Sequence, residues 1–119
     1  GTAEIYRVIE QIPQIHDSLV FGLPVDDDEQ IVLCVVLQEG ELDSSLADFI
    51  RKQLRGQASP RHVPRRIYRV SEIPYTLNGK KVEAAVQKTI LGQPVKNKGS
   101  LINPDCLEEY SHLLERSYQ

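Results

Sequence analysis

The sequence predicts an α+β domain in which helices pack on a short sheet of about three strands. Four segments carry apolar residues at the spacing of one helical face, and three shorter segments have the apolar or alternating character of strands. A chain of 119 residues is also long enough for one domain with a single modest core. The predicted order is helix, strand, strand, helix, strand, helix, helix.

The first part of the chain predicts a helix followed by a hairpin. Thr2 is the expected helix cap, and Pro13 ends the helix. The apolar residues on its inner face are Ile5, Val8, Ile9 and Ile12. Residues 16–24 predict a strand, the charged residues 26–30 a turn, and residues 31–37 (IVLCVVL) a strand buried on both faces.

The middle of the chain predicts a second helix and a third strand. The helix begins near Ser44 or Ser45, and its apolar residues are Leu46, Phe49, Ile50 and Leu54. Two prolines stiffen the basic stretch that follows, residues 58–66 (ASPRHVPRR). Residues 66–70 alternate between polar and apolar side chains, which is typical of a strand.

The last part of the chain predicts two more helices. The first carries Val82, Ala85, Val86 and Ile90 on one face, and Gly92 terminates it. Pro104 suits the first turn of the final helix. The apolar stripe expected on that helix is Leu107, Tyr110 and Leu114.

Composition and charge favour a small soluble domain that does not act on nucleic acid or in a membrane. The net charge of −3 disfavours a nucleic acid partner, because proteins that neutralise phosphates are usually basic. No apolar stretch reaches the roughly 18–20 residues of a membrane span. The cysteines, Cys34 and Cys106, have no CxxC partner, so we expect a reducing, cytoplasmic location. Gly1 leads directly into a helical pattern, and we therefore expect the chain to be a piece of a longer protein.

Neither the acidic residues nor the histidines predict a metal or catalytic site. Three successive carboxylates at residues 26–28 cannot all point one way in an extended chain, and no EF-hand spacing follows, so an exposed hairpin tip is favoured. His16 and His112 lack partners at catalytic spacing. His62 lies in a basic turn, where a surface role is favoured over help to a phosphate site.

Residues 73–86 (IPYTLNGKKVEAAV) place two lysines between a turn and a helix. The Asn-Gly pair at 78–79 favours a tight turn, since glycine adopts positive φ freely and asparagine tolerates it. A lysine at a helix N-terminus opposes the helix dipole at a cost of about 0.3–1 kcal/mol, which hints at a function for Lys80. A phosphate-binding GxxxxGK[ST] loop is excluded by Pro74 and Lys81. These local sequence features alone still favour Lys80 as a solvated surface lysine.

At these residues the sequence resembles the adenylate-forming acyl-CoA synthetases. IPYTLNGKKVE is similar to their C-terminal signature, in which a Pro-x-Thr-x-x-Gly-Lys loop carries the catalytic lysine, and residues 1–24 resemble the segment after their domain hinge, where Gly-x-x-Glu-Ile opens a helix. The resemblance covers residues 1–90. It implies the small C-terminal domain of that fold, with residues 1–92 as the mobile lid and residues 93–119 as an extension carrying a final helix.

Within the family, the segments SPRHVP and GSLINPDCLEEY look most like those of the acetoacetyl-CoA synthetases. Tyr75 stands where a lysine is usual in the related acetate enzymes, and Asn78 where serine or threonine is usual. The assignment of the acid substrate rests on this resemblance alone, because the acyl pocket of the family belongs to the large N-terminal domain. A ligase for acetate or another short-chain acid, and a non-catalytic binding or regulatory domain with the same fold, remain as alternatives.

The resemblance implies ATP-dependent formation of an acyl-adenylate and diphosphate, followed by displacement of AMP by the CoA thiol. By motif alignment Lys80 is the catalytic residue, and Thr76 and Gly79 are substrate-binding residues of the same loop. Lys81 is then solvated or in contact with the partner domain.

The resemblance also implies that the domain rotates about a hinge between the two steps. In relatives an arginine meets the nucleotide phosphates of CoA, and Arg51 occupies the nearest matching position, with Arg55 and Arg61 as neighbours that could substitute. ATP with Mg²⁺, and CoA, are expected as substrates of the full-length enzyme, with none bound by this domain alone. The expected partner is the large N-terminal domain, without which the fragment is inactive.

Overall fold

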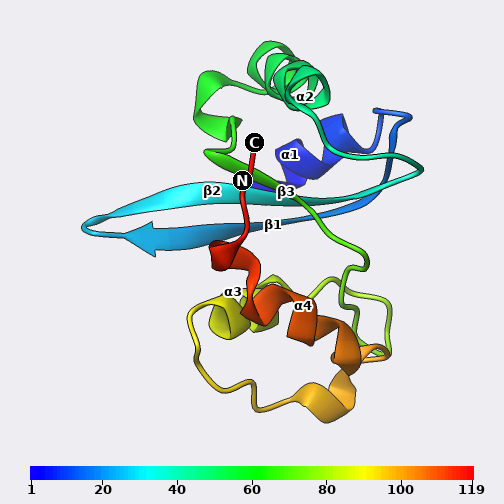
Figure 1. Cartoon of the computed structure of the whole chain (residues 1–119), viewed down its shortest axis with the longest axis vertical. Helices are drawn as coiled ribbons and strands as arrows, with labels where there is room; N and C mark the ends of the chain where they lie inside the picture. The colour runs from blue at the N-terminus through cyan, green and yellow to red at the C-terminus, as the bar shows by residue number, and fades with distance from the viewer.

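A three-stranded sheet in the order β1-β2-β3 runs through the middle of the molecule (Figure 1). A computed structural model describes all 119 residues. Strand β1 (Ile15–Val25) pairs antiparallel with β2 (Asp28–Leu37), and β2 pairs parallel with β3 (Arg66–Arg69). The predicted α+β class and the predicted order of helices and strands are confirmed.

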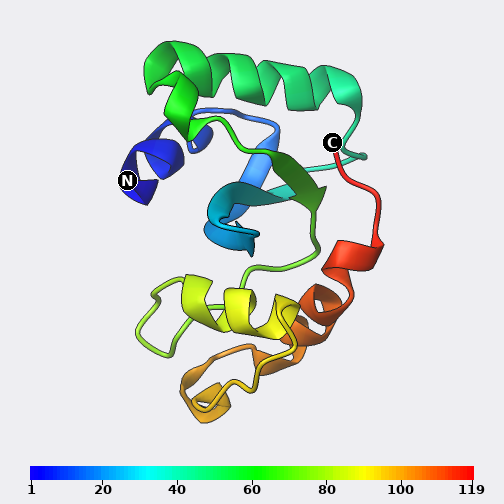
Figure 2. The same ribbon diagram turned by 90° about the vertical axis from the view of Figure 1, so that its left-hand side faces the viewer.

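Helices cover both faces of this sheet. Helices α1 (Thr2–Ile9) and α2 (Ser44–Gln57) lie on one face, and α3 (Glu83–Ile90) and α4 (Leu107–Ser111) lie on the other (Figure 2). The central strand β2 supplies both cores with fully buried side chains, because successive residues of a strand point to opposite faces. Val32 and Cys34 belong to the core beneath α3 and α4, and Leu33 and Val35 to the core beneath α1 and α2.

The charged run at residues 26–30 lies at the tip of a hairpin, as predicted, but the turn is shorter than expected because residues 28–30 already belong to β2. Residues 26 and 27 make the turn, and both are exposed. Asp26 adopts a positive φ of 55°, a conformation that aspartate tolerates better than most residues. The acidic residues therefore serve a turn at the end of a long hairpin.

The start of the first helix differs from the expectation, whereas the second helix begins at Ser44, as predicted. Gly1 is the cap residue of α1, and Thr2 is already helical and makes no capping hydrogen bond. In α2 the cap is Asp43, whose Oδ1 accepts a hydrogen bond of 2.8 Å from the backbone N–H of Leu46. The carboxylate of Asp43, one position upstream of Ser44, thus caps a helix that begins where predicted.

The prediction that Phe49 and Leu114 are core residues is also wrong, because the two helices turn slightly different faces to the core than expected. In α2, Phe49 is 41% exposed and Ala47 is buried in its stead. At the C-terminus α4 is short and gives way to the 3₁₀ turn Leu113–Glu115. Leu113 is fully buried, whereas Leu114 is 42% exposed.

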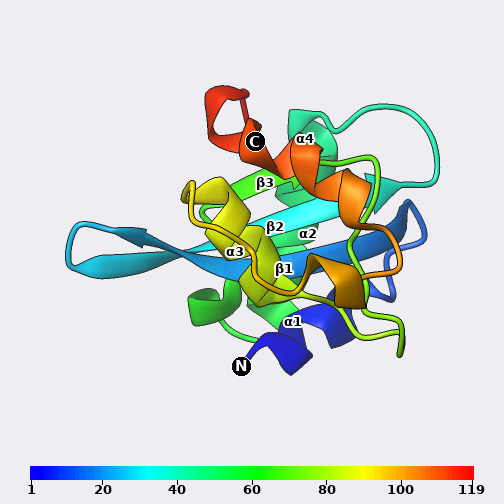
Figure 3. The same ribbon diagram turned by 90° about the horizontal axis from the view of Figure 1, so that it is seen from below.

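The C-terminal extension, residues 93–119, lies beside α3 (Figure 3), and its part between residues 101 and 113 packs into the same core. Leu101, Leu107, Tyr110 and Leu113 join that core. The final residues then run along the free edge of β3, where Gln119 N–H donates a hydrogen bond of 3.1 Å to the carbonyl of Ile67. The boundary expected at residue 92 stays a prediction. None of the helices has the length and apolar character needed to cross a membrane.

Candidate functional site

The loop of residues 75–81, named here the lysine loop, is a closed turn just before α3. An antiparallel bridge joins Tyr75 to Lys81 at its base. Thr76 organises the interior: its N–H donates to the Lys80 carbonyl at 2.8 Å, its carbonyl accepts from Gly79 N–H at 2.9 Å, and its Oγ1 accepts from Lys80 N–H at 3.1 Å. The structure thus brings together three of the residues that the sequence singled out.

Gly79 allows the turn to close. Its φ is +80°, in the region where a side chain is strained, although a Cβ there would meet no atom within 4 Å. Glycine is therefore required by the backbone angle and not by lack of space. The side chain of Lys80, the next residue, is exposed and makes no hydrogen bond or ion pair within the chain. Its ammonium group is free to meet an anion.

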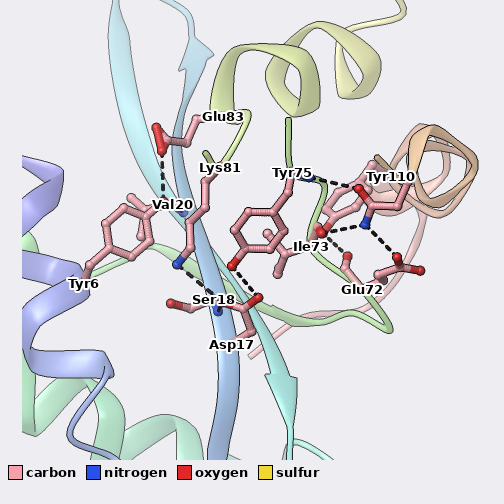
Figure 4. A network of polar contacts seen from close by, with 11 residues as sticks. Tyr6, Asp17, Ser18, Val20, Glu72, Ile73, Tyr75, Lys81, Glu83 and Tyr110 are labelled. Carbon is pink, nitrogen blue, oxygen red and sulfur yellow. Dashed lines mark hydrogen bonds and ion pairs between the residues drawn. The ribbon is translucent and has the colours of Figure 1, made fainter. Parts of the chain in front are cut away.

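Lys81 behaves in the opposite way (Figure 4). Its Nζ lies 3.4 Å from Oδ1 of Asp17 and 4.1 Å from the centre of the Tyr6 ring. Only 20% of its side chain is exposed. The expectation that Lys81 is solvated is wrong, because the side chain turns back onto β1 and α1.

Hydrogen bonds extend this contact into a network. The hydroxyl of Tyr75 donates to Oδ2 of Asp17 at 2.7 Å. The hydroxyl of Tyr6 donates to Glu83 Oε1 at 3.3 Å and accepts from Val20 N–H at 2.9 Å. Burial raises the pKa of both tyrosines, and for Tyr75 the hydrogen bond to Asp17 raises the pKa further. Both phenols therefore stay protonated and can donate at neutral pH.

Sequence reasoning missed this network because its members are far apart along the chain. Tyr75 and Asp17 are separated by 58 positions, and Tyr6 and Glu83 by 77. The signal that could have pointed to it is Tyr75 itself, which stands where the sequence analysis expects a lysine in the related acetate enzymes.

The C-terminal extension holds the other side of the lysine loop. Asn103 accepts a hydrogen bond from Tyr75 N–H through its Oδ1 at 3.0 Å, and its Nδ2 donates to the carbonyl of Ile73 at 2.9 Å. The backbone of Thr76 bridges to Leu101. Tyr110 fixes the preceding segment, since its hydroxyl donates to the carbonyl of Glu72 at 2.7 Å (Figure 4).

Arg51 lies away from the lysine loop, on the helix that covers the opposite face of the sheet. Its Nε donates to the carbonyl of Pro64 at 3.1 Å, and its Nη2 to the carbonyl of Gln119 at 2.6 Å. The structure therefore does not bring Arg51 and Lys80 together. Arg55 and Arg61 are exposed on the Arg51 side.

The remaining polar candidates have local structural partners. His62 Nδ1 lies 2.7 Å from Ser59 Oγ, and its Nε2 lies 3.5 Å from Glu4, so the ring ties a turn to α1. Burial raises the pKa of the Cys34 thiol, and burial with nearby carboxylates raises the pKa of Cys106 to about 11. No group of three or more His, Cys, Asp or Glu side chains is arranged to hold a metal ion.

Comparison with known proteins places this geometry in a family. Residues 4–80 match the model of the AMP-binding enzyme C-terminal domain. The chain is 45% identical over 116 residues to an acetoacetyl-coenzyme A synthetase of Rhizobium meliloti, covering 97% of the chain and 18% of that protein. It is 42% identical over 115 residues to a malonamoyl-CoA synthetase of Penicillium aethiopicum, covering 91% of the chain and 16% of that protein.

The fold agrees with these sequence matches. The acetoacetyl-CoA synthetase structure from Streptomyces lividans superposes with a TM-score of 0.86 and 38% identity, covering 98% of this chain and 18% of that one. The chain thus spans 16–18% of the length of these relatives.

Proposed function

Because the chain belongs to the family of AMP-binding enzyme C-terminal domains, we propose that it is the mobile domain of an AMP-forming acid–CoA ligase whose acid is acetoacetate. The relatives named acetoacetyl-CoA synthetase support this acid. The relative named malonamoyl-CoA synthetase supports a related short acid as the second candidate. The large domain that precedes the hinge in the family is the proposed partner, in the cytoplasm.

The proposed reaction has two steps. In the first, a carboxylate oxygen of the acid attacks the α-phosphorus of ATP, and diphosphate leaves. In the second, the CoA sulfur attacks the acyl carbon, its proton is released, and AMP leaves. The first step brings anionic oxygens together, so a fixed cation at the forming bond lowers its barrier. Mg²⁺ would arrive with the ATP phosphates.

Lys80 is the proposed cation for this step. The observation that carries the proposal is its exposed ammonium group, which has no partner within the chain and stands on a loop closed by Thr76 and Gly79. A lysine kept only for folding would be expected to contact its own domain, as Lys81 does. Lysine also suits the task as a compact charge on a flexible stem.

Arg51 is the proposed contact for the CoA nucleotide phosphates in the second step. Its Nη1 makes no hydrogen bond within the chain and remains available to an anion, while Nε and Nη2 hold the backbone. Since Arg51 and Lys80 lie on opposite faces of the sheet, a rotation of the domain would present them in turn.

The test uses the full-length protein with Lys80→Ala. Acetoacetate-dependent exchange of diphosphate into ATP should fall roughly 10²- to 10³-fold, because one stabilising charge is lost. Thioester formation from supplied acyl-adenylate should be unchanged. Lys88→Ala, which removes an exposed lysine of the following helix α3, is the matched control and should leave both reactions unchanged.

Exchange at the wild-type level in Lys80→Ala would overturn the proposal and favour a non-catalytic binding or regulatory domain. Exchange supported by acetate or malonamate but not by acetoacetate would keep the mechanism and change the acid.

A further inference from the structure

Both ends of the lysine loop are held by one carboxylate. Tyr75 begins the loop and reaches Oδ2 of Asp17, and Lys81 closes the loop and reaches Oδ1 of the same residue (Figure 4). Each oxygen therefore holds one end. The residues between them make hydrogen bonds only to each other and to the C-terminal extension, so Asp17 is the polar link from the loop to the sheet.

Asp17 is well suited to be a fixed point. It belongs to β1 and pairs with Val36 in the sheet. The register shifts between Ile15 and Asp17, and an irregularity of this kind redirects a side chain. The Oδ1 atom also accepts a hydrogen bond of 2.8 Å from Ser18 N–H, which fixes the orientation of the carboxylate.

Lys81 is confined on its other side by an aromatic ring. Its Nζ lies over Tyr6, whose hydroxyl is itself held by Val20 and Glu83. The ion pair with Asp17 is mostly shielded, since 20% and 24% of the two side chains are exposed. Solvent screening weakens such a pair less than it weakens a surface ion pair.

The geometry of the loop transmits this anchoring to Lys80. Lys81 pairs with Tyr75 in a bridge, and successive residues of an extended chain point to opposite faces. With Lys81 directed inward to Asp17, Lys80 is directed outward. We propose that Asp17 is a positioning residue for adenylation, which acts through Tyr75 and Lys81 to set the direction of the Lys80 side chain.

This inference rests on the proposed function of Lys80 and adds a second requirement, that its ammonium be held in one direction. Misplacement by about 1 Å can cost up to roughly 10²-fold in rate. Asp17→Asn can still accept from Tyr75 but loses the negative charge that holds Lys81. Tyr75→Phe loses one hydroxyl and keeps the ion pair.

The experiment measures both half-reactions of the full-length protein. In Asp17→Asn and Lys81→Met, kcat for diphosphate exchange should fall roughly 10- to 100-fold, with KM for acid and ATP little changed. Thioester formation from supplied acyl-adenylate should be unaffected. Lys81→Arg should recover most of the exchange lost in Lys81→Met. The exchange rate of Tyr75→Phe should lie between those of the wild type and of Asp17→Asn. Asp27→Asn, an exposed carboxylate at the tip of the same hairpin, is the matched control.

If Asp17 had only a structural role, its replacement would lower the rates of both half-reactions together. That result would overturn the inference. The double variant Lys80→Ala with Asp17→Asn should exchange no more slowly than Lys80→Ala, because Asp17 acts only through Lys80. An additional loss in the double variant, or wild-type exchange in Asp17→Asn, would also overturn it. Should Asp17→Asn fail to fold, Tyr75→Phe and the Arg–Met comparison at position 81 decide in its place. Wild-type exchange in Lys80→Ala itself would instead overturn the proposed function.

Discussion

Two neighbouring lysines just before α3 have different environments. Lys80 extends into solvent, whereas Lys81 folds back onto Asp17 and Tyr6. The turn and the exposure of Lys80 could be predicted from Asn78 and Gly79, since those residues act locally. The environment of Lys81 could not, because its partners lie on a distant strand and helix and only tertiary packing brings them near.

At the residue scale, Gly79→Ala tests the value of one backbone angle. A Cβ at φ +80° has room but costs about 1–2 kcal/mol in this conformation. The loop must carry that strain or turn away, so we expect diphosphate exchange by the full-length protein to fall about tenfold, with thioester formation preserved.

Gly99→Ala is the control for this prediction, because Gly99 also has open space around it and does not adopt a positive φ. Equal exchange rates in the two variants would show that the positive φ of Gly79 has no part in adenylation.

The elements of the fold follow from the sequence period, and the error at the C-terminus occurs where that period changes. The apolar run in β2 predicted a strand buried on both faces, and it is the central strand. At the C-terminus an α-helical period placed Leu114 inward, but the chain tightens to a 3₁₀ turn after His112. A 3₁₀ turn repeats every three residues, which places Leu113 inward instead.

At the element scale, alanine substitutions of adjacent leucines should separate sharply. Leu113→Ala removes a fully buried side chain and should lower the free energy of unfolding by about 2–5 kcal/mol. Leu114→Ala removes a side chain that is 42% exposed, so a change of about 0.5 kcal/mol or less is expected.

Denaturant unfolding of the full-length protein, followed by a probe placed in this domain, checks the pair. Equal destabilisation by the two variants would mean that the last turn remains α-helical in solution.

The molecule as a whole keeps its two candidate contact regions on different sides of the sheet. The lysine loop leads into α3, and Arg51 projects from α2 on the opposite face. The sequence predicted the elements but not which helix covers which face, since every helix offers an apolar stripe of similar character. The network around Asp17 and the support from Asn103 likewise could not be predicted from the sequence, because they join segments from the beginning, middle and end of the chain.

At the scale of the whole molecule, Arg51→Ala in the full-length protein should affect only the second step. Loss of a charged hydrogen bond of about 1.5–3 kcal/mol predicts that KM for CoA rises roughly 10- to 100-fold. Diphosphate exchange should remain near the wild-type rate, because Lys80 lies across the sheet.

Arg55→Ala, an exposed arginine on the same helix, is the comparison variant. If Arg55→Ala raised KM for CoA and Arg51→Ala did not, the CoA contact would belong to Arg55, and Arg51 would serve only to hold the backbone near Pro64.

The bridge between Thr76 and Leu101 affects when the lysine loop can fold during synthesis. Synthesis proceeds from the N-terminus, so residues 76–80 leave the ribosome before the segment that supports them. Leu77 N–H donates to Ser100 and Ile102 N–H to Tyr75, and these bonds form only when that later segment has emerged. A nascent chain interrupted before residue 100 would hold Lys80 on a turn that lacks this support. Translation products that stop before residue 100 of this sequence should therefore be poor at adenylation even where residues 1–92 have folded.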